Sequence, residues 1–215
     1  MQLYAMWGRD FPLNFVHWDA VHYLYLAQHG YPAHFDPRDA FFPGYPGLIH
    51  LGMLVIHDPV KAALAVSIGS SVVACWFVVQ LARHEFDGGA DASLAGWLLV
   101  LWPGAFFMFA PYSEAPFVAA AAASLYLMRR GRFGWAAVAA AIASVIRPVG
   151  LGLAVALLVE IIRQRGWRSL PLIAVVPLPV LGYFAYLGIH TGDFMGYVHA
   201  EASPSFGIHL AWPWV

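Results

Sequence analysis

Long apolar runs separated by short polar connections dominate the sequence after residue 60. Six runs are predicted to be mostly helical segments, at 62–82, 92–110, 115–128, 135–146, 150–162 and 170–189. A helix of about 20 apolar residues rises about 30 Å, which matches the hydrocarbon core of a bilayer. The pattern therefore predicts an all-α fold, a polytopic transmembrane helical bundle.

A shorter apolar stretch at residues 41–57 contains Pro43, Pro46 and three glycines. The pattern leaves two interpretations open. In the first, the stretch crosses the membrane, and residues 1–40 are cytoplasmic. In the second, it forms an interfacial or re-entrant helix, and residues 1–40 lie outside.

Basic residues indicate the orientation, because Lys and Arg near the ends of spans favour the cytoplasmic side. Every second connection holds arginines, and these account for seven of the 11 basic residues: Arg83, Arg129, Arg130, Arg132, Arg163, Arg165 and Arg168. The alternate connections, at residues 111–114, at 147–148 and from 190 onward, are then expected to share the outer face. That face is where chemistry is expected.

Composition excludes several classes of protein. With 61% hydrophobic and 11% charged residues, against about 25% charged in soluble domains, the chain is not expected to be a soluble enzyme. A formal charge of −1 offers no basic surface for nucleic acid. The only lysine, Lys61, follows Val60, so no phosphate-binding P-loop is present.

No metal or cofactor site is predicted either. Histidines 17, 22, 29 and 34 are five to seven residues apart, which is not a usual spacing for metal ligands. We interpret them as interfacial or hydrogen-bonding side chains.

Three ionisable residues near the ends of apolar segments are functional candidates, because charges are expensive beside lipid. They are Asp19, Glu114 and Arg147. Each also has a structural interpretation. Asp19 could cap a helix that begins near Ala20, Glu114 could cap one that begins at Ala115, and Arg147 could be a snorkelling or helix-end residue. We interpret Asp10, Asp36 and Asp39 as solvated loop charges.

Several motifs occur in an order that resembles the PIG-V-like mannosyltransferases, of the GT-C superfamily of multi-pass glycosyltransferases. The motifs are His17-Trp18-Asp19-Ala20 with Gly30-Tyr31, Phe41-Phe42-Pro43-Gly44-Tyr45-Pro46, Pro103-Gly104-Ala105-Phe106-Phe107 with Tyr112-Ser113-Glu114, and Arg147-Pro148-Val149-Gly150. The resemblance covers residues 15–152. The tail from Thr191 to Trp214 resembles a later outer loop of bacterial relatives.

The resemblance implies transfer of mannose, with inversion, from a polyprenyl-phosphate-mannose donor to a hydroxyl of a lipid or glycan acceptor on the outer face. It implies that Asp19 is the base, and it places residues 1–40 outside as the catalytic loop. We expect Arg147 to hold the donor phosphate, and Glu114 to orient the acceptor or to fix Arg147. Tyr112, His17 and Trp18 are candidates for the substrate pocket, although His17 and Trp18 could equally be interfacial anchors.

These expectations combine into one integral-membrane domain over residues 1–215. It has transmembrane helices at 60–189 and a second outer loop at 190–215. Family members normally carry helices before and after this region, so the chain is expected to be truncated at both ends. Ten arginines against one lysine, together with abundant alanine, suggest a GC-rich bacterial genome, so the expected location is a bacterial plasma membrane. The alternatives are a transporter or lipid-binding protein, and a non-catalytic membrane subunit; the partner subunit of the latter is unknown.

Overall fold

The computed structural model describes residues 16–86 and 92–206, and these residues form helices with no β-strand among them. The α-helices are α2 (Asp19–His29), α3 (Gly44–Met53), α4 (Pro59–Glu85), α5 (Ala92–Leu101), α6 (Phe106–Phe109), α7 (Glu114–Arg129), α8 (Phe133–Ile146), α9 (Gly152–Arg163), α10 (Leu178–Thr191) and α11 (Gly196–Glu201). The 3₁₀ helices are η2 (Pro37–Ala40), η3 (Pro103–Ala105), η4 (Pro148–Leu151) and η5 (Trp167–Val175). The predicted all-α class is confirmed.

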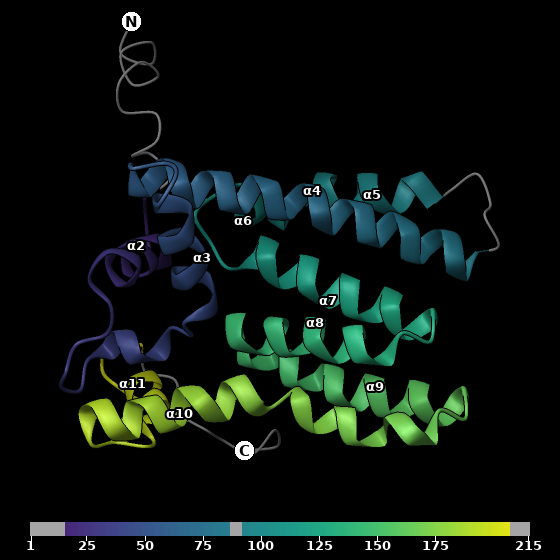
Figure 1. Ribbon diagram of the computed structural model, residues 1–215. Helices are drawn as coiled ribbons and strands as arrows, with labels where there is room; N and C mark the ends of the chain where they lie inside the picture. The colour runs from purple at the N-terminus through teal and green to yellow at the C-terminus, as the bar shows by residue number, and fades with distance from the viewer. Residues whose placement is uncertain (1–15, 87–91, 207–215) are drawn as a thin grey trace, which may run out of the picture.

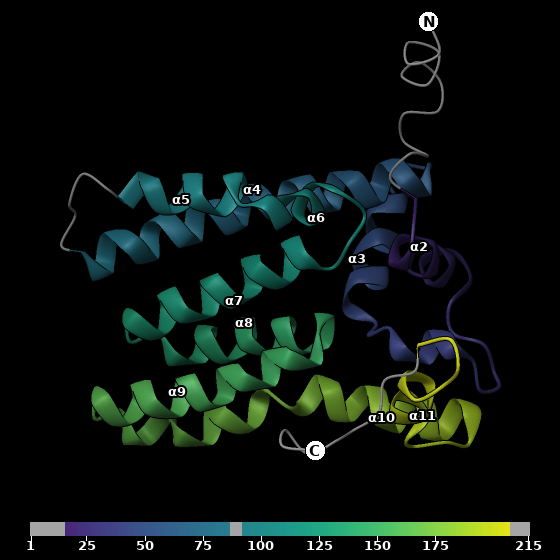
Figure 2. The ribbon, with the colours of Figure 1, turned by 180° about the vertical axis from the view of Figure 1, so that it is seen from behind.

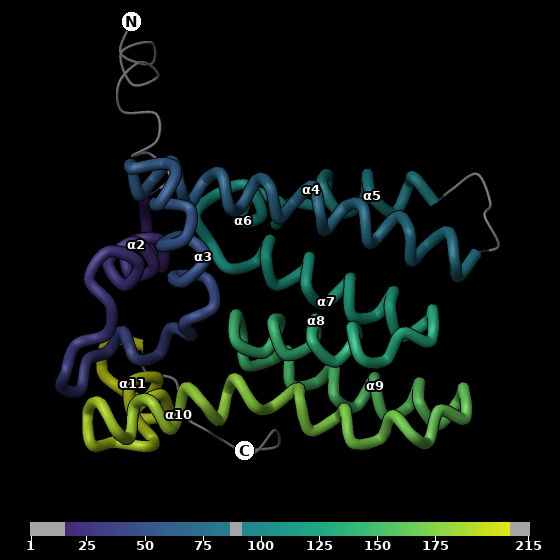
Figure 3. Tube along the Cα trace, in the orientation of Figure 1, coloured from purple at the N-terminus to yellow at the C-terminus, as the bar shows by residue number. Residues whose placement is uncertain are grey.

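The long helices lie roughly side by side, as Figure 1 and the view from behind in Figure 2 show. α4, α5, α7, α8, α9 and the η5–α10 pair run along one direction, and the tube in Figure 3 follows the chain back and forth between the two ends of this bundle. α2, α3 and α11 gather at one end. This end brings the N-terminal third of the described chain next to its C-terminal part.

Each of the six predicted apolar runs contains a helix, but most of these helices are shorter than a membrane span. Within residues 16–86 and 92–206, two helices are long and apolar enough to cross a membrane, Pro59–Glu85 and Trp167–Thr191, of 27 and 25 residues. The pair Ala92–Leu101 and Pro103–Phe109 makes a third if it is counted as one span, although it is bent by 70°. Pro103 explains the bend, because proline lacks the amide hydrogen that continues a helix.

The segment at 41–57 forms a short helix. α3 has ten residues, about 15 Å at 1.5 Å per residue, which is half of a bilayer core. The hydroxyl of its buried Tyr45 is 2.8 Å from Ser67 Oγ of α4. α3 is therefore attached to the bundle by packing and by a buried hydrogen bond.

Small residues and buried serines hold the bundle together. α7 and α8 meet where Met128 packs in one cluster with Ala136, Ala137 and Ala140, and small residues of this kind let helix backbones approach closely. Ser124 donates to the carbonyl of Ala136 at 2.8 Å, and Ser71 donates to that of Met108 at 2.6 Å. These hydroxyls therefore join neighbouring helices through hydrogen bonds and bury no charged group.

The end of the bundle away from α2 and α11 is tied by ion pairs. Arg129 in the last turn of α7 pairs with Glu85 of α4 and, at 3.4 Å, with Glu160 of α9. Glu160 is buried and also pairs with Arg163 at 2.7 Å. Arg83 and Arg163 lie in the last turns of α4 and α9, so the arginine-rich connections share this end.

The first prediction concerns Gly44, where α3 crosses the end of α8. A Cβ at Gly44 would lie 2.7 Å from the carbonyl oxygen of Val145 and 2.8 Å from Ile146 Cα, whereas one at Gly47 would meet nothing within 4 Å. Gly44→Ala should therefore lower the free energy of unfolding by about 1–3 kcal/mol. Gly47→Ala, inside the same helix, should leave it unchanged or raise it by up to about 1 kcal/mol.

Thermal unfolding of both variants in detergent micelles, followed by circular dichroism, measures this difference. Equal unfolding temperatures for the two variants would show that α3 does not pack on α8 as described.

Candidate functional site

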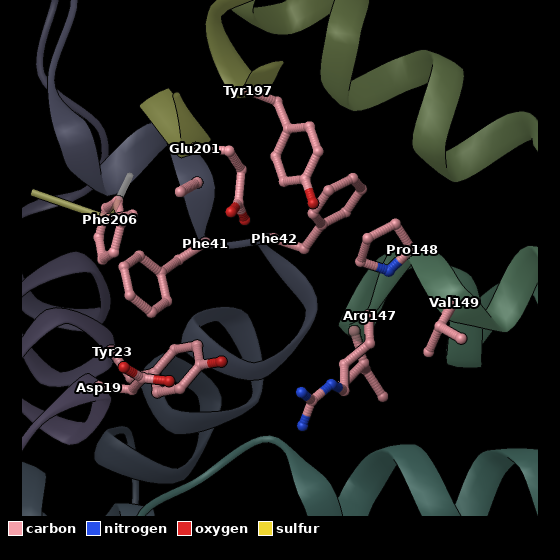
Figure 4. A pocket seen from close by; sticks show the side chains of 12 residues that line it. Asp19, Tyr23, Phe41, Phe42, Arg147, Pro148, Val149, Tyr197, Glu201 and Phe206 are labelled. Atoms are coloured by element: carbon pink, nitrogen blue, oxygen red, sulfur yellow. The ribbon is translucent and has the colours of Figure 1, made fainter. Parts of the chain in front are cut away.

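A pocket of about 400 Å³ opens where α2, α11 and the junction of α8 with η4 meet. Figure 4 shows its side chains: Asp19 and Tyr23 project from α2, Arg147 projects from the opposite side, and Glu201 and Tyr197 project from α11. Aromatic and aliphatic side chains complete the lining, namely Phe41, Phe42, Ile146, Pro148, Val149 and Phe206 with Ala40. The pocket therefore combines two carboxylates, one guanidinium and an apolar wall.

Asp19 enters the pocket because of the backbone turn before α2. Trp18 has φ 50° and ψ −125°, an uncommon conformation for a residue with a side chain, and α2 begins directly after it. Trp18 is the N-cap residue and makes no side-chain capping bond. The alternative that Asp19 caps a helix starting at Ala20 is therefore wrong, and its carboxylate is left to line the pocket.

Two hydrogen bonds fix the connection between α6 and α7 against α2. The Tyr112 hydroxyl donates to the carbonyl of His17 at 2.9 Å, and the Tyr23 hydroxyl donates to Ser113 Oγ at 2.9 Å. These bonds join residues about 90 positions apart. They place Glu114, which follows Ser113, close to the start of α2.

Glu114 and Arg147 form an ion pair between α7 and the end of α8. α7 begins at Glu114 with Ser113 as its N-cap residue and with no side-chain capping bond, so the capping interpretation of Glu114 is wrong. Arg147 Nη1 instead donates to Glu114 Oε1 at 2.5 Å. The other carboxylate oxygen, Oε2, is buried and has no hydrogen-bond partner in the described part of the chain.

The backbone at Arg147 explains why its side chain turns into the pocket. Arg147 ends α8 in an extended conformation, φ −145° and ψ 130°, as is usual before a proline. It is thus a helix-end residue, as one interpretation held. Its guanidinium also lines the pocket and pairs with Glu114, so Arg147 is more than the residue that ends the helix.

The two carboxylates of the pocket, Asp19 and Glu201, both have pKa values raised above those of ordinary surface acids. Asp19 is exposed at the open side of the pocket, yet partial desolvation by its neighbours raises its pKa above the usual value, and the charge of Glu114 raises it further, while His22 and Arg147 oppose the shift. Burial also raises the pKa of Glu201, and the Asp19 charge adds to that increase. A carboxylate of this kind accepts a proton more readily than one in water.

The structure brings some of the predicted residues together and leaves others apart. Asp19 and Arg147 line the pocket, and Glu114 and Tyr112 support it from the connection before α7. His17 and Trp18 are exposed, Trp18 at 73%, and neither lines the pocket. Among the described residues no group of three or more His, Cys, Asp or Glu is placed to hold a metal ion.

Glu201 and Tyr197 were not predicted as site residues. They lie on α11, a helix of six residues, which the sequence pattern does not reveal. The hydrogen bond between His199 Nδ1 and Asp193 Oδ2, at 2.7 Å, and the Phe42–Tyr197 ring contact at 5.0 Å position this helix. The one available signal was the expectation that the tail after residue 190 shares a face with the other candidates.

Asp39 and Asp36, which we interpreted from the sequence as solvated loop charges, both make specific contacts in the structure. Asp39 is fully buried in η2, so its interpretation as a solvated charge is wrong. Its backbone carbonyl accepts a hydrogen bond from Tyr183, and its Oδ2 accepts one from the amide of Asp36. Asp36 is ion-paired with Arg38 at 2.6 Å, and Asp10 lies outside the described residues, as do residues 207–215 of the tail.

The fold and the pocket define a helical protein with membrane-type spans and a site built from carboxylates and an arginine. Residues 3–170 match the family described as Mannosyltransferase (PIG-V). The chain belongs to this family, as its motifs predicted.

Individual relatives agree with the family match. The chain is 28% identical over 145 residues to human GPI alpha-1,6-mannosyltransferase 2, and 32% identical to the rat protein of that name. These matches cover 63% and 62% of this chain and 29% of each relative. The chain thus spans about 29% of the length of the curated relatives it matches, and no solved structure gives a significant match.

The second prediction uses the raised pKa of Asp19. Because folding favours the protonated carboxyl, its ionisation at neutral pH opposes folding, and Asp19→Asn should be more stable than the parent at pH 7. The gain should shrink as pH falls through the raised pKa, and it should vanish below 3.8, where the unfolded chain is protonated as well. Thermal unfolding across this pH range measures it.

Asp36→Asn is the control, with a stability change of the opposite sign. Hydrogen bonds from Arg38 lower the pKa of Asp36, so ionised Asp36 stabilises the fold. Asp36→Asn should therefore be less stable than the parent at pH 7, and the deficit should shrink in acid. A loss of stability at neutral pH in Asp19→Asn would contradict the environment described for Asp19.

Proposed function

We propose that this chain is an integral-membrane glycosyltransferase that transfers mannose, with inversion, from a polyprenyl-phosphate-mannose donor to a hydroxyl of a lipid or glycan acceptor. The observation that carries the proposal is the pocket in which Asp19 faces Arg147. One side offers a proton acceptor, and the other offers a cation for a leaving phosphate. Membership of the mannosyltransferase family names the sugar.

In the proposed reaction the acceptor oxygen attacks the anomeric carbon of mannose. The new carbon–oxygen bond forms as the bond between that carbon and the phosphate oxygen breaks, and the phosphate leaves with the bonding electrons. Asp19 takes the proton of the acceptor hydroxyl, and Arg147 stabilises the negative charge of the phosphate. Inversion requires that nucleophile and leaving group stand on opposite sides of the sugar, which agrees with the positions of these residues in Figure 4.

We assign supporting roles to the neighbouring residues. Glu114 fixes the guanidinium of Arg147 at the wall of the pocket. Tyr112 holds the connection before α7 against α2. The exposure of His17 and Trp18 favours the interpretation of these two residues as interfacial anchors.

The distribution of arginines supports an extracytoplasmic position for the pocket. The last turns of α4, α7 and α9 carry Arg83, Arg129 and Arg163 at the end of the bundle opposite to α2 and α11. Because arginines favour the cytoplasmic side, this distribution supports our proposal that the pocket faces the extracytoplasmic side. The bacterial plasma membrane remains part of the proposal. A lipid-linked donor reaches such a site from the bilayer, and no nucleotide sugar is required.

The third prediction is the loss of transfer in Asp19→Asn. Membranes that contain the chain should transfer radiolabelled mannose from polyprenyl-phosphate-mannose to membrane lipids above the level of empty membranes. At equal expression Asp19→Asn should reduce the rate by about 10²- to 10⁴-fold, because the proton acceptor is lost. In the parent the rate should fall in acid as Asp19 becomes protonated, with the midpoint above pH 3.8.

Asp36→Asn removes an acid outside the pocket and should keep the parental rate and pH profile. Equal transfer by Asp19→Asn and the parent would refute the role of Asp19. Transfer no higher than in empty membranes would refute the enzyme, and it would favour a lipid-binding or non-catalytic membrane protein.

A further inference from the structure

Two arginine-rich turns lie against each other at the end of the bundle opposite to α2 and α11. One joins α7 to α8, and the other joins α9 to η5. Gln164 Nε2 donates to the backbone carbonyl of Met128 at 2.9 Å. A Cβ at Gly131 would lie 3.1 Å from Gln164 Oε1, and one at Gly166 would lie 2.7 Å from the ring of Phe133. The two turns are therefore in direct contact.

Exposed arginines in and beside these turns carry positive charge that no ion pair neutralises within residues 16–86 and 92–206. We call them the arginine patch: Arg130, Arg132, Arg165 and Arg168. The nearby carboxylates Glu85 and Glu160 are occupied by the ion pairs described above. Arg130 lies over the ring of Tyr126, a contact that leaves its charge uncompensated. The patch is therefore ready to receive an anion.

Arg165 occupies a backbone position that usually belongs to glycine. α7 and α9 end in the same motif, in which the amide two residues beyond the helix cap donates to a carbonyl five residues earlier. The left-handed position of this motif is Gly131 after α7, at φ 67°, and Arg165 after α9, at φ 56°. A residue with a Cβ is strained there, whereas glycine is not. The chain therefore keeps a guanidinium at a cost in stability, and such strain is typical of functional positions.

Exposed apolar side chains adjoin the arginine patch. Trp135 in the first turn of α8 and Trp167 at the start of η5 are 68% and 56% exposed. Tryptophan at such positions is typical of the interface between a bilayer and water. Along α9, Val155, Val159 and Ile162 are exposed and recur at the spacing of one helix face. The patch thus begins where an apolar helix face ends, which is the position that a lipid head group takes.

We propose that the arginine patch binds the head group of an anionic phospholipid whose acyl chains lie on the exposed face of α9. Guanidinium groups bind phosphate oxygens through paired hydrogen bonds, and basic clusters between helix ends bind anionic head groups. A phosphocholine head carries its own cation and no net charge, so it matches the patch less well. The inference uses no residue of the pocket and does not depend on the proposed transfer of mannose.

The strained backbone of Arg165 allows lipid binding to be separated from folding. Arg165→Gly removes the guanidinium and also relieves the left-handed conformation, so this variant should unfold at a temperature about 2–4 °C higher than the parent. Arg130→Gln removes one charge from the other turn. Lys61→Gln is the control, because Lys61 lies in the first turn of α4, at the opposite end of the bundle, and its side chain is 63% exposed.

The fourth prediction compares two phospholipids with the same acyl chains and different heads. The purified full-length chain in dodecyl maltoside micelles at low salt should bind tritiated dioleoylphosphatidylglycerol about tenfold or more tightly than dioleoylphosphatidylcholine. Arg165→Gly and Arg130→Gln should each weaken phosphatidylglycerol binding about fivefold, because each removes one cation from the head group. Neither variant should change phosphatidylcholine binding, and Lys61→Gln should change the binding of neither lipid.

Several results would overturn the lipid assignment. These are equal affinities of the parent for the two lipids, unchanged phosphatidylglycerol binding in Arg165→Gly and Arg130→Gln, and the same loss in Lys61→Gln. Displacement of phosphatidylglycerol by an equal concentration of inorganic phosphate would assign the patch to a soluble anion. Displacement by an equal concentration of a single-stranded oligonucleotide would assign it to nucleic acid, and either result would refute the proposal.

The unfolding temperature shows whether a loss of binding is a loss of fold. Weaker phosphatidylglycerol binding in an Arg165→Gly protein that is more stable than the parent would establish the guanidinium as a lipid contact. A lower unfolding temperature in Arg165→Gly would refute the strain at this position, and Arg130→Gln would then decide the lipid assignment. The assay contains no sugar donor, so its outcome is separate from that of the transfer assay.

Discussion

The ion pair between Arg147 and Glu114 is the interaction on which the candidate site depends. In a chain with 11% charged residues, a charge between apolar helices is expensive unless a partner of opposite charge stands beside it. The pair places opposite charges next to each other and links the start of α7 to the end of α8. It also holds the guanidinium at a wall of the pocket, opposite Asp19.

The remainder of the site is built around this pair by hydrogen bonds between distant segments. Tyr112 and Tyr23 attach the connection before α7 to α2, and Tyr183 of α10 reaches the carbonyl of Asp39. These contacts are aromatic hydroxyls bonded to backbone or to serine, which suits an apolar environment where free charge is costly. The bundle itself needs only alanine faces and a few serines, so its charged groups collect at its two ends.

The sequence predicted much of this organisation because the underlying signals are strong. Apolar runs located the helices, and the expense of charge beside lipid singled out Asp19, Glu114 and Arg147. The pattern did not show that Pro103 bends the second run by 70°, or that several helices are shorter than a span. Proline within an apolar run permits either a kink or a break, and only the packing of the neighbouring helices selects between them.

The missed features depend on tertiary contacts. Glu201 lies on a six-residue helix that exists because α10, η2 and the Asp193–His199 pair support it, so no periodic signal was available. Asp39 resembles any polar loop residue in the sequence, yet the packing of η2 buries it. The capping interpretations of Asp19 and Glu114 were wrong because Trp18 and Ser113 occupy the N-cap positions, and the Glu114 carboxylate pairs with Arg147 instead.

A double-mutant cycle tests most directly whether the Arg147–Glu114 pair holds the site together. The free energy of unfolding would be measured in detergent for the parent, Glu114→Gln, Arg147→Gln and the double variant. The exposed Lys61–Asp58 pair, at 3.7 Å, serves as the reference. We predict a coupling energy of about 1 kcal/mol or more for Arg147 with Glu114, and a smaller one for the reference pair. A coupling energy near zero for Arg147 with Glu114 would contradict the account.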